Sequence, residues 1–118
     1  MNVLFIDNPV GTGFSYVDDL KYLTTDNFQI ADDLVELLRG FYEKLPQFKK
    51  IPLHIFSESY GGKMAAQFAL TLDRAIRAKK IECNLQSVSM GDAWISPMDS
   101  MYSWAPFLLN MVYLFLKT

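Results

Sequence analysis

The stretch that decides the fold is LHIFSESYGG, residues 53–62, which joins a predicted strand to a predicted helix through a very tight turn. Leu53–Ser57 is the strand, and apolar residues recur at helical spacing after Gly62. Within this stretch, Ser57–Gly61 fits the pattern Gly-x-Ser-x-Gly of a nucleophile elbow, with Ser57 in place of the first glycine. Small residues on both sides of the serine let the two backbones approach, while Ser59 takes a strained conformation that exposes its hydroxyl.

The chemistry of this turn centres on Ser59 as the candidate nucleophile. The backbone N–H of Tyr60 would point at the reaction centre from the helix N-terminus, where it can stabilise an oxyanion. The alternative interpretation is an ordinary strand-to-helix turn in which Ser59 is only the N-cap. The strand–helix context favours the elbow.

Outward from the turn, predicted strands and helices alternate. Val3–Ile6 is a continuous apolar run, typical of a strand buried on both faces, and Ser87–Met90 is a third strand. The first helix begins at Thr25 or Asp26 and ends before Pro46. This order predicts three parallel strands with two crossover helices in one α/β domain over residues 1–118. The expected core residues are Ile30, Leu34, Leu37, Leu38, Phe41 and Leu45 in the first helix, and Met64, Ala65, Phe68, Ala69, Leu72, Ala75 and Ile76 in the second.

Composition narrows the class of function. Of the 118 residues, 51% are hydrophobic and 20% charged, as in a globular protein. The net charge of -2 gives no basic surface for nucleic acid and no polybasic membrane patch. The most apolar stretch, residues 105–116, is shorter than the roughly 20 residues that span a bilayer, so a core helix or the cut end of a larger core is expected. The sequence predicts no signal peptide at Met1, because Met1 leads directly into the apolar run.

The sequence gives little indication of a nucleotide-binding or metal-binding site. The loop Gly11–Tyr16 follows a strand, but Tyr16 stands where a dinucleotide-binding loop has its third glycine, and no phosphate-loop pattern is present. The single cysteine, Cys83, is expected to be a buried small hydrophobe or half of a disulfide without its partner. His54 and Cys83 are isolated from other metal-binding residues, so neither a metal nor a cofactor is expected.

Three linked segments resemble the serine carboxypeptidases, most of all their retinoid-inducible branch. They are DNPVGTGFSY at residues 7–16, IFSESYGGK at residues 55–63 and GDAWISP at residues 91–97, and the likeness extends to about residue 112. The resemblance implies a partial α/β-hydrolase, in which the three predicted strands correspond to the fourth, fifth and sixth of eight. The family's third strand, which inserts between the fourth and fifth, has no counterpart in this sequence, so the first two strands must close a gap or leave ladder groups unpaired.

The resemblance also implies roles for individual residues. Ser59 would be the nucleophile and the Tyr60 amide an oxyanion donor, while the Tyr60 side chain would line the pocket for the penultimate substrate residue. Glu58 would help bind the C-terminal carboxylate of the substrate, and a role in the substrate pocket is open to Asn8. Taken without the family, Glu58 is a solvated residue of the turn and residues 7–16 are a structural loop, which we favour for Gly11 and Gly13.

A serine nucleophile needs a base, and His54 is the only histidine in the sequence. Five residues along one strand separate it from Ser59 by about 16 Å, while a base must lie within about 3 Å. His54 is therefore expected to be a satisfied strand histidine. In α/β-hydrolases the triad acid and histidine follow the nucleophile in the chain, and no histidine follows Ser59, so both are expected to lie outside this chain.

The resemblance implies a fragment of a secretory-pathway, lysosomal or extracellular serine carboxypeptidase that acts on peptide C-termini. The chain alone is expected to be inactive. The alternatives are a shortened product that works, if at all, as a binding module, and an acyltransferase of the same family.

Overall fold

The computed structural model describes residues 1–111, which form a partial α/β fold with one small parallel sheet. The helices are α1 (Asn27–Lys44), α2 (Gly61–Arg77) and α3 (Pro97–Asn110). The strands are β1 (Pro52–Glu58) and β2 (Asn84–Gly91), and two short 3-10 turns are η1 (Leu20–Tyr22) and η2 (Pro46–Phe48). The strands pair in parallel with a register shift between Leu53 and His54, and α2 provides the crossover between them.

Helix α1 has clear start and stop signals. The carboxylate of Asp26 accepts hydrogen bonds from the backbone N–H groups of Phe28 and Gln29, at 2.8 and 2.9 Å, so Asp26 rather than Thr25 is the N-cap. Pro46 begins η2 just after the helix ends at Lys44. The buried face agrees with the helical pattern except at Leu37 and Leu45, which are exposed. The buried residues are Ile30, Ala31, Leu34, Val35, Leu38 and Tyr42.

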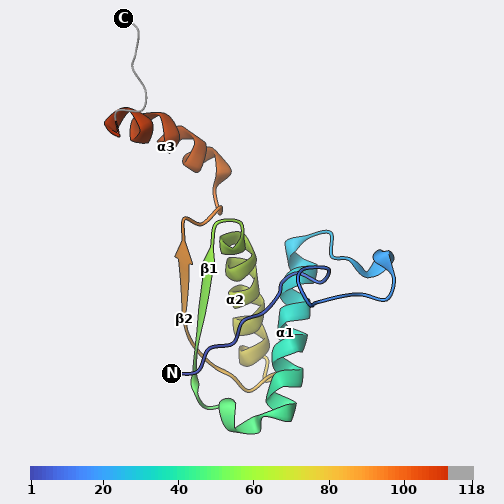
Figure 1. Ribbon diagram of the computed structural model, residues 1–118. Coiled ribbons are helices and arrows are strands. Elements are labelled where there is room, and N and C mark those ends of the chain that lie inside the picture. Colours follow the sequence, from blue (N-terminus) through green and yellow to red (C-terminus); the bar gives the residue numbers. More distant parts are fainter. Residues whose placement is uncertain (112–118) are drawn as a thin grey trace, which may run out of the picture.

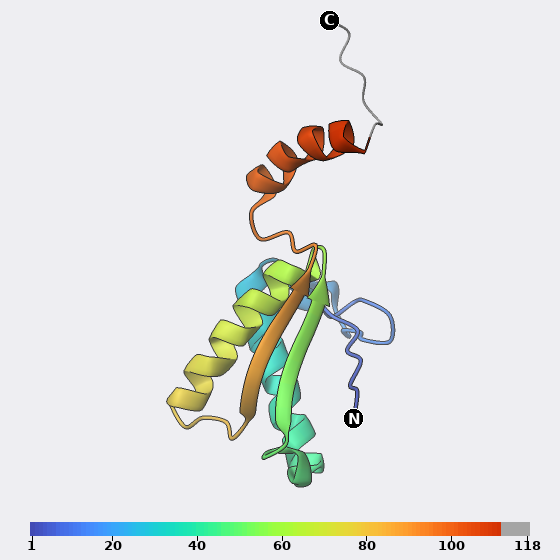
Figure 2. The same cartoon turned by 90° about the vertical axis from the view of Figure 1, so that its left-hand side faces the viewer.

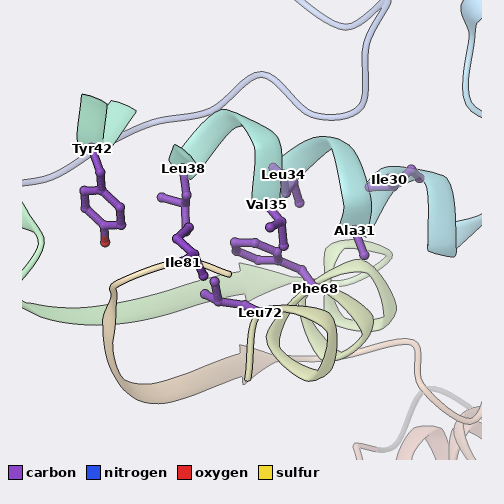
Figure 3. Packing of buried hydrophobic residues seen from close by; sticks show 9 residues of the cluster. All are labelled: Ile30, Ala31, Leu34, Val35, Leu38, Tyr42, Phe68, Leu72 and Ile81. Carbon is purple, nitrogen blue, oxygen red and sulfur yellow. The ribbon is translucent and has the colours of Figure 1, made fainter. Parts of the chain in front are cut away.

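The core lies between α1, α2 and one face of the sheet (Figures 1 and 3). Helix α2 packs against both strands, and α1 packs on α2. Phe68 and Leu72 from α2 meet the buried side chains of α1 and Ile81 in the middle of this core. Along β1, inward residues alternate with outward ones, so Leu53 and Ile55 face the helices while Phe56, 77% exposed, lies on the open face.

The predicted strand at Val3–Ile6 is absent, so the sheet has two strands and not three. Residues 1–8 form no helix or strand, and Figure 2 shows them beyond β1, on the side away from β2. Val3 is 62% and Phe5 91% exposed, and only Ile6 packs against the core. An apolar run becomes a buried strand only where a neighbouring strand edge pairs with it and layers cover both faces. Residues 1–111 provide neither a pairing strand nor covering layers for Val3–Ile6.

Helix α3 stands away from the rest of the molecule (Figure 1). Among the described residues it contacts no other helix or strand, and it has no buried residue. The radius of gyration, 18.1 Å, exceeds the roughly 13–14 Å of a compact chain of this length. Of the two expectations for residues 105–116, a helix in this chain's own core is therefore wrong for residues 105–111, while the cut end of a larger core agrees with the exposed α3. Residues 112–116 lie outside the described part. No helix within residues 1–111 is long and apolar enough to cross a membrane.

Candidate active site

The candidate nucleophile lies at the junction of β1 and α2, as the sequence predicts. Ser59 follows the last residue of β1, α2 begins two residues later at Gly61, and Ser59 is exposed. Its φ of 53° is a left-handed conformation that residues with a side chain rarely adopt. A non-glycine residue in this region carries backbone strain, and such strain concentrates at functional sites. The geometry is that of a nucleophile elbow, while the chemical role of Ser59 stays a prediction.

The residues beside Ser59 share its exposed position. Glu58 and Tyr60 are both exposed, and Tyr60 is 52% exposed. The ammonium group of Lys63, in the first turn of α2, lies 4.3 Å from the centre of the Tyr60 ring, a cation–π contact. Tyr60 is the N-cap residue of α2 and its side chain makes no capping bond. Because Glu58, Ser59 and Tyr60 immediately precede α2, they lie at the positive end of its helix dipole.

Asn8 reaches the same part of the fold from the N-terminal segment. Its side-chain amide donates to the sulfur of Met64 in α2, at 3.3 Å, and Asn8 is half-buried. The loop that follows is built as a structural turn. Gly11 and Gly13 have φ of 91° and 55°, and a side chain at Gly13 would collide with the Asp7 carboxylate that accepts from the Phe14 N–H at 2.8 Å. This confirms the structural role expected for the two glycines.

Ser57 occupies the first position of the elbow, where the usual pattern has glycine. The Ser57 hydroxyl is buried and has no hydrogen-bond partner among the described residues. Its side chain lies close to Gly61, where an added Cβ would sit 3.5 Å from the Cβ of Ser57. This is an ordinary van der Waals distance, and residues 1–111 show no partner that would require the hydroxyl.

His54 does not face the elbow. Its ring Nδ1 lies 2.7 Å from the hydroxyl oxygen of Ser87, the residue paired with it on β2. The sequence predicts a satisfied strand histidine, and this contact confirms it. His54 lies on the open face of the sheet, so the only imidazole of the sequence does not orient or deprotonate Ser59.

Cys83 is a free, half-buried thiol packed against the core, as expected of a small hydrophobe. Its sulfur lies 3.3 Å from the phenol oxygen of Tyr42. Burial raises the pKa of the thiol, and burial followed by the contact with Cys83 raises the pKa of Tyr42. Cys83 is thus in an environment that disfavours thiolate chemistry. No group of three or more His, Cys, Asp or Glu side chains within residues 1–111 could hold a metal ion.

Sequence reasoning missed the segment that touches the elbow from the neighbouring strand. The backbone N–H of Ser59 donates to the Gly91 carbonyl at 2.9 Å, and the Trp94 N–H donates to the Ser59 carbonyl at 2.9 Å. The sequence could have indicated this neighbourhood, because the carboxyl ends of adjacent parallel strands meet at one edge of a sheet. Strand register decides which residues meet, and the register pairs Glu58 with Gly91.

The sequence of this chain matches a family model and the sequences of known proteins. The family described as serine carboxypeptidase, peptidase S10, matches residues 1–115. Retinoid-inducible serine carboxypeptidase from Rattus norvegicus is 48% identical over 110 residues, which cover 93% of this chain and 24% of the rat protein. Serine carboxypeptidase-like 51 from Arabidopsis thaliana is 40% identical over 113 residues, 93% of this chain and 24% of that protein.

A solved structure supports the fold. The crystal structure of Kex1(Δ)p, a prohormone-processing carboxypeptidase from Saccharomyces cerevisiae, matches with a TM-score of 0.83 at 24% sequence identity. The match covers 94% of this chain and 25% of that one. This chain therefore spans about a quarter of the length of the relatives that it matches.

Proposed function

The chain belongs to the serine carboxypeptidase family, and we propose that Ser59 is the nucleophile with which the complete protein releases C-terminal amino acids from peptides. The observation that carries the proposal is the left-handed backbone of Ser59, φ 53°, between the end of β1 and the start of α2. A strained serine at a strand–helix junction has its hydroxyl exposed at the edge of the sheet, as nucleophilic attack requires.

In the proposed reaction, the Ser59 hydroxyl oxygen attacks the carbonyl carbon of the last peptide bond. The C–N bond breaks, the proton passes through a base to the leaving amine, and an ester to Ser59 remains. Water then attacks the ester, returns a proton to Ser59 and leaves the shortened peptide with a new carboxylate. The Tyr60 N–H, at the N-terminus of α2, would stabilise the oxyanion formed in both steps.

Substrate binding would use the polar residues beside Ser59. We assign Glu58 to the C-terminal carboxylate, the Tyr60 side chain to the pocket for the penultimate residue, and Asn8 to the lining of the substrate pocket. Two carboxyl groups share a hydrogen bond only when one is protonated, so a Glu58–substrate contact would favour acidic pH. The partners are peptide or protein C-termini, in a secretory, lysosomal or extracellular setting.

The 118-residue chain alone is proposed to be inactive. Its only histidine is His54, which lies on the open face of the sheet against Ser87. A base for Ser59, the triad acid and the second oxyanion donor would all come from other parts of the complete protein.

The test uses a chimera in which the 110 residues of this chain that align with the rat relative replace the matching segment of that protein. The chimera should react with a fluorophosphonate probe and release the C-terminal amino acid from a blocked dipeptide. Ser59→Ala should abolish the labelling and lower peptidase activity by at least about a thousandfold, because the triad acts as a unit.

The isolated 118-residue chain, with Ser59→Ala as its control, should not be labelled. Peptidase activity that survives Ser59→Ala in the chimera would contradict the assignment of the nucleophile. Ser59-dependent labelling of the isolated chain would instead contradict its proposed inactivity.

A further inference from the structure

The two strands end side by side, and the backbone turns in the same unusual way after each. Glu58, the last residue of β1, pairs with Gly91, the last residue of β2. The next residues, Ser59 and Asp92, have φ of 53° and 44°. Asp92 is exposed, and its side chain makes no hydrogen bond within residues 1–111. Asp92 thus contributes to this turn through its backbone conformation.

The turn after β2 satisfies both backbone groups of Ser59. The Ser59 N–H donates to the Gly91 carbonyl at 2.9 Å. The Ser59 carbonyl accepts from Trp94 N–H at 2.9 Å and from Gly62 N–H at 3.0 Å. A strained conformation persists only where its surroundings over-determine it. Three hydrogen bonds, two of them from a segment more than thirty residues away, supply that constraint.

Gly62 sets how closely the two turns approach. An added Cβ at Gly62 would collide with the Ala93 Cβ and lie 2.8 Å from the Ala93 Cα, so the backbone of residue 93 would have to move. An added Cβ at Gly61 would cause no collision, since its nearest neighbour would be the Ser57 Cβ at an ordinary van der Waals distance of 3.5 Å. The second glycine of the pair therefore serves the contact with residues 91–94 and not the strand–helix approach alone.

We propose that residues 91–94, packed against Gly62, form a positioning element that holds Ser59 in its left-handed conformation. The chemical meaning of the element rests on the proposed function, because it fixes the residue assigned as nucleophile. None of Gly62, Asp92, Ala93 or Trp94 would touch the reacting atoms. They act through the backbone of Ser59.

The first test measures amide hydrogen exchange by NMR in the 118-residue chain. The exchange rates of the Ser59 and Trp94 amides report the two hydrogen bonds between Ser59 and the turn after β2. The exchange rates of the Leu34 and Leu38 amides report global stability. The one-bond Cα–Hα coupling of Ser59 reports the sign of its φ. Gly62→Ala perturbs the element because the added Cβ collides with Ala93, and Gly61→Ala is its control. Asp92→Val perturbs it by conformation, because a β-branched residue strongly resists a positive φ, and Asp92→Gly is the conservative rescue.

Gly62→Ala and Asp92→Val should each make the Ser59 and Trp94 amides exchange roughly fivefold to tenfold faster, the effect of losing about one hydrogen bond. They should also shift the Ser59 coupling away from the value of a positive φ, while exchange in α1 stays unchanged. Gly61→Ala and Asp92→Gly should resemble the wild type. Unchanged Ser59 amides in both perturbing variants, or equal acceleration throughout α1, would overturn the proposal.

A second test links the element to the reaction and uses the chimera. Gly62→Ala should slow fluorophosphonate labelling about tenfold to a hundredfold, because small displacements of a reacting group are costly. Gly40→Ala, which lies in α1 with nothing within 4 Å of the added Cβ, should label normally. Normal labelling of Gly62→Ala would count against the positioning role. A chimera that is unlabelled without any substitution refutes the proposed function, and the exchange measurements still decide the positioning element.

Discussion

At the scale of single residues, the two side chains that invite a catalytic interpretation have different environments. Ser59 is exposed at a strained turn, whereas His54 is held on the open face of the sheet by Ser87. A hydroxyl without a base is a poor nucleophile at neutral pH. The candidate nucleophile is thus exposed at the elbow, while the single histidine of the sequence is directed to the open face of the sheet.

Tyr42 leads to a prediction about alkaline pH. Its pKa is raised above the usual 10.0 by burial and by the contact with Cys83, so the folded state resists loss of the phenol proton. The unfolded chain loses that proton more readily, and the stabilisation present below pH 10 declines as the pH rises further. The raised pKa of Cys83 acts in the same direction from its usual value of 9.0.

We expect Tyr42→Phe to lower the free energy of unfolding at pH 7 by about 1 kcal/mol, through loss of the contact with Cys83. Above pH 10 its stability should decline less steeply than that of the wild type. Urea denaturation at pH 7, 9, 10 and 11 measures both effects, with Tyr102→Phe as an exposed control. Parallel declines in wild type and Tyr42→Phe would show that Tyr42 does not titrate differently in the folded state.

At the scale of elements, α1 and α2 follow from local rules. Apolar residues at helical spacing face the core, Asp26 caps the first helix, and Pro46 follows its end. A further bond runs from the N–H of Thr25, the residue before the N-cap, to the side-chain oxygen of Gln29 at 2.7 Å and ties the preceding segment to the first turn. These interactions join residues within four positions of one another and are therefore readable from the sequence.

The N-cap gives the prediction at this scale. Asp26→Ala should lower the free energy of unfolding by about 1 kcal/mol, because the N–H groups of Phe28 and Gln29 lose their acceptor. Asp26→Asn keeps a side-chain oxygen and should recover most of the loss. Asp33→Ala, an exposed aspartate within α1, is the matched control and should change little. Equal losses for Asp26→Ala and Asp33→Ala in urea denaturation would argue against the capping role.

At the scale of the whole molecule, much apolar surface has no cover among the described residues. The outer face of the sheet presents Phe56, and α3 exposes Met98, Met101, Tyr102, Trp104 and Phe107. A helix that is apolar on most sides usually lies within a core. The chain spans about a quarter of the length of its relatives, which is consistent with surfaces built to be covered in a longer protein.

The exposure of α3 predicts the result of a double variant, Trp104→Gln with Phe107→Gln. Because α3 contacts no other element within residues 1–111, the free energy of unfolding should change by less than about 0.5 kcal/mol. The fluorescence of a hydrophobic dye bound to the protein should fall, since exposed apolar surface is removed. Phe68→Gln, which alters the core, should instead destabilise by several kcal/mol, roughly 3 or more. A comparable loss in the double variant would show that α3 packs on the body.

The sequence by itself determined the parts that depend on neighbours along the chain. These are the elbow at Ser59, the helices on both sides of β1 and the positions of β1 and β2. The periodicity of apolar residues and the capping and turn residues encode such features locally, so no distant contact is needed to read them.

Only the tertiary structure decided which segments meet. Val3–Ile6 has the composition of a buried strand but lies unpaired beyond β1, because a strand needs a partner edge that residues 1–111 do not supply. The contact of residues 91–94 with Ser59 depends on the register that pairs Glu58 with Gly91. Strand pairing and close packing join residues far apart in the chain, and a pattern in one segment does not name its partner.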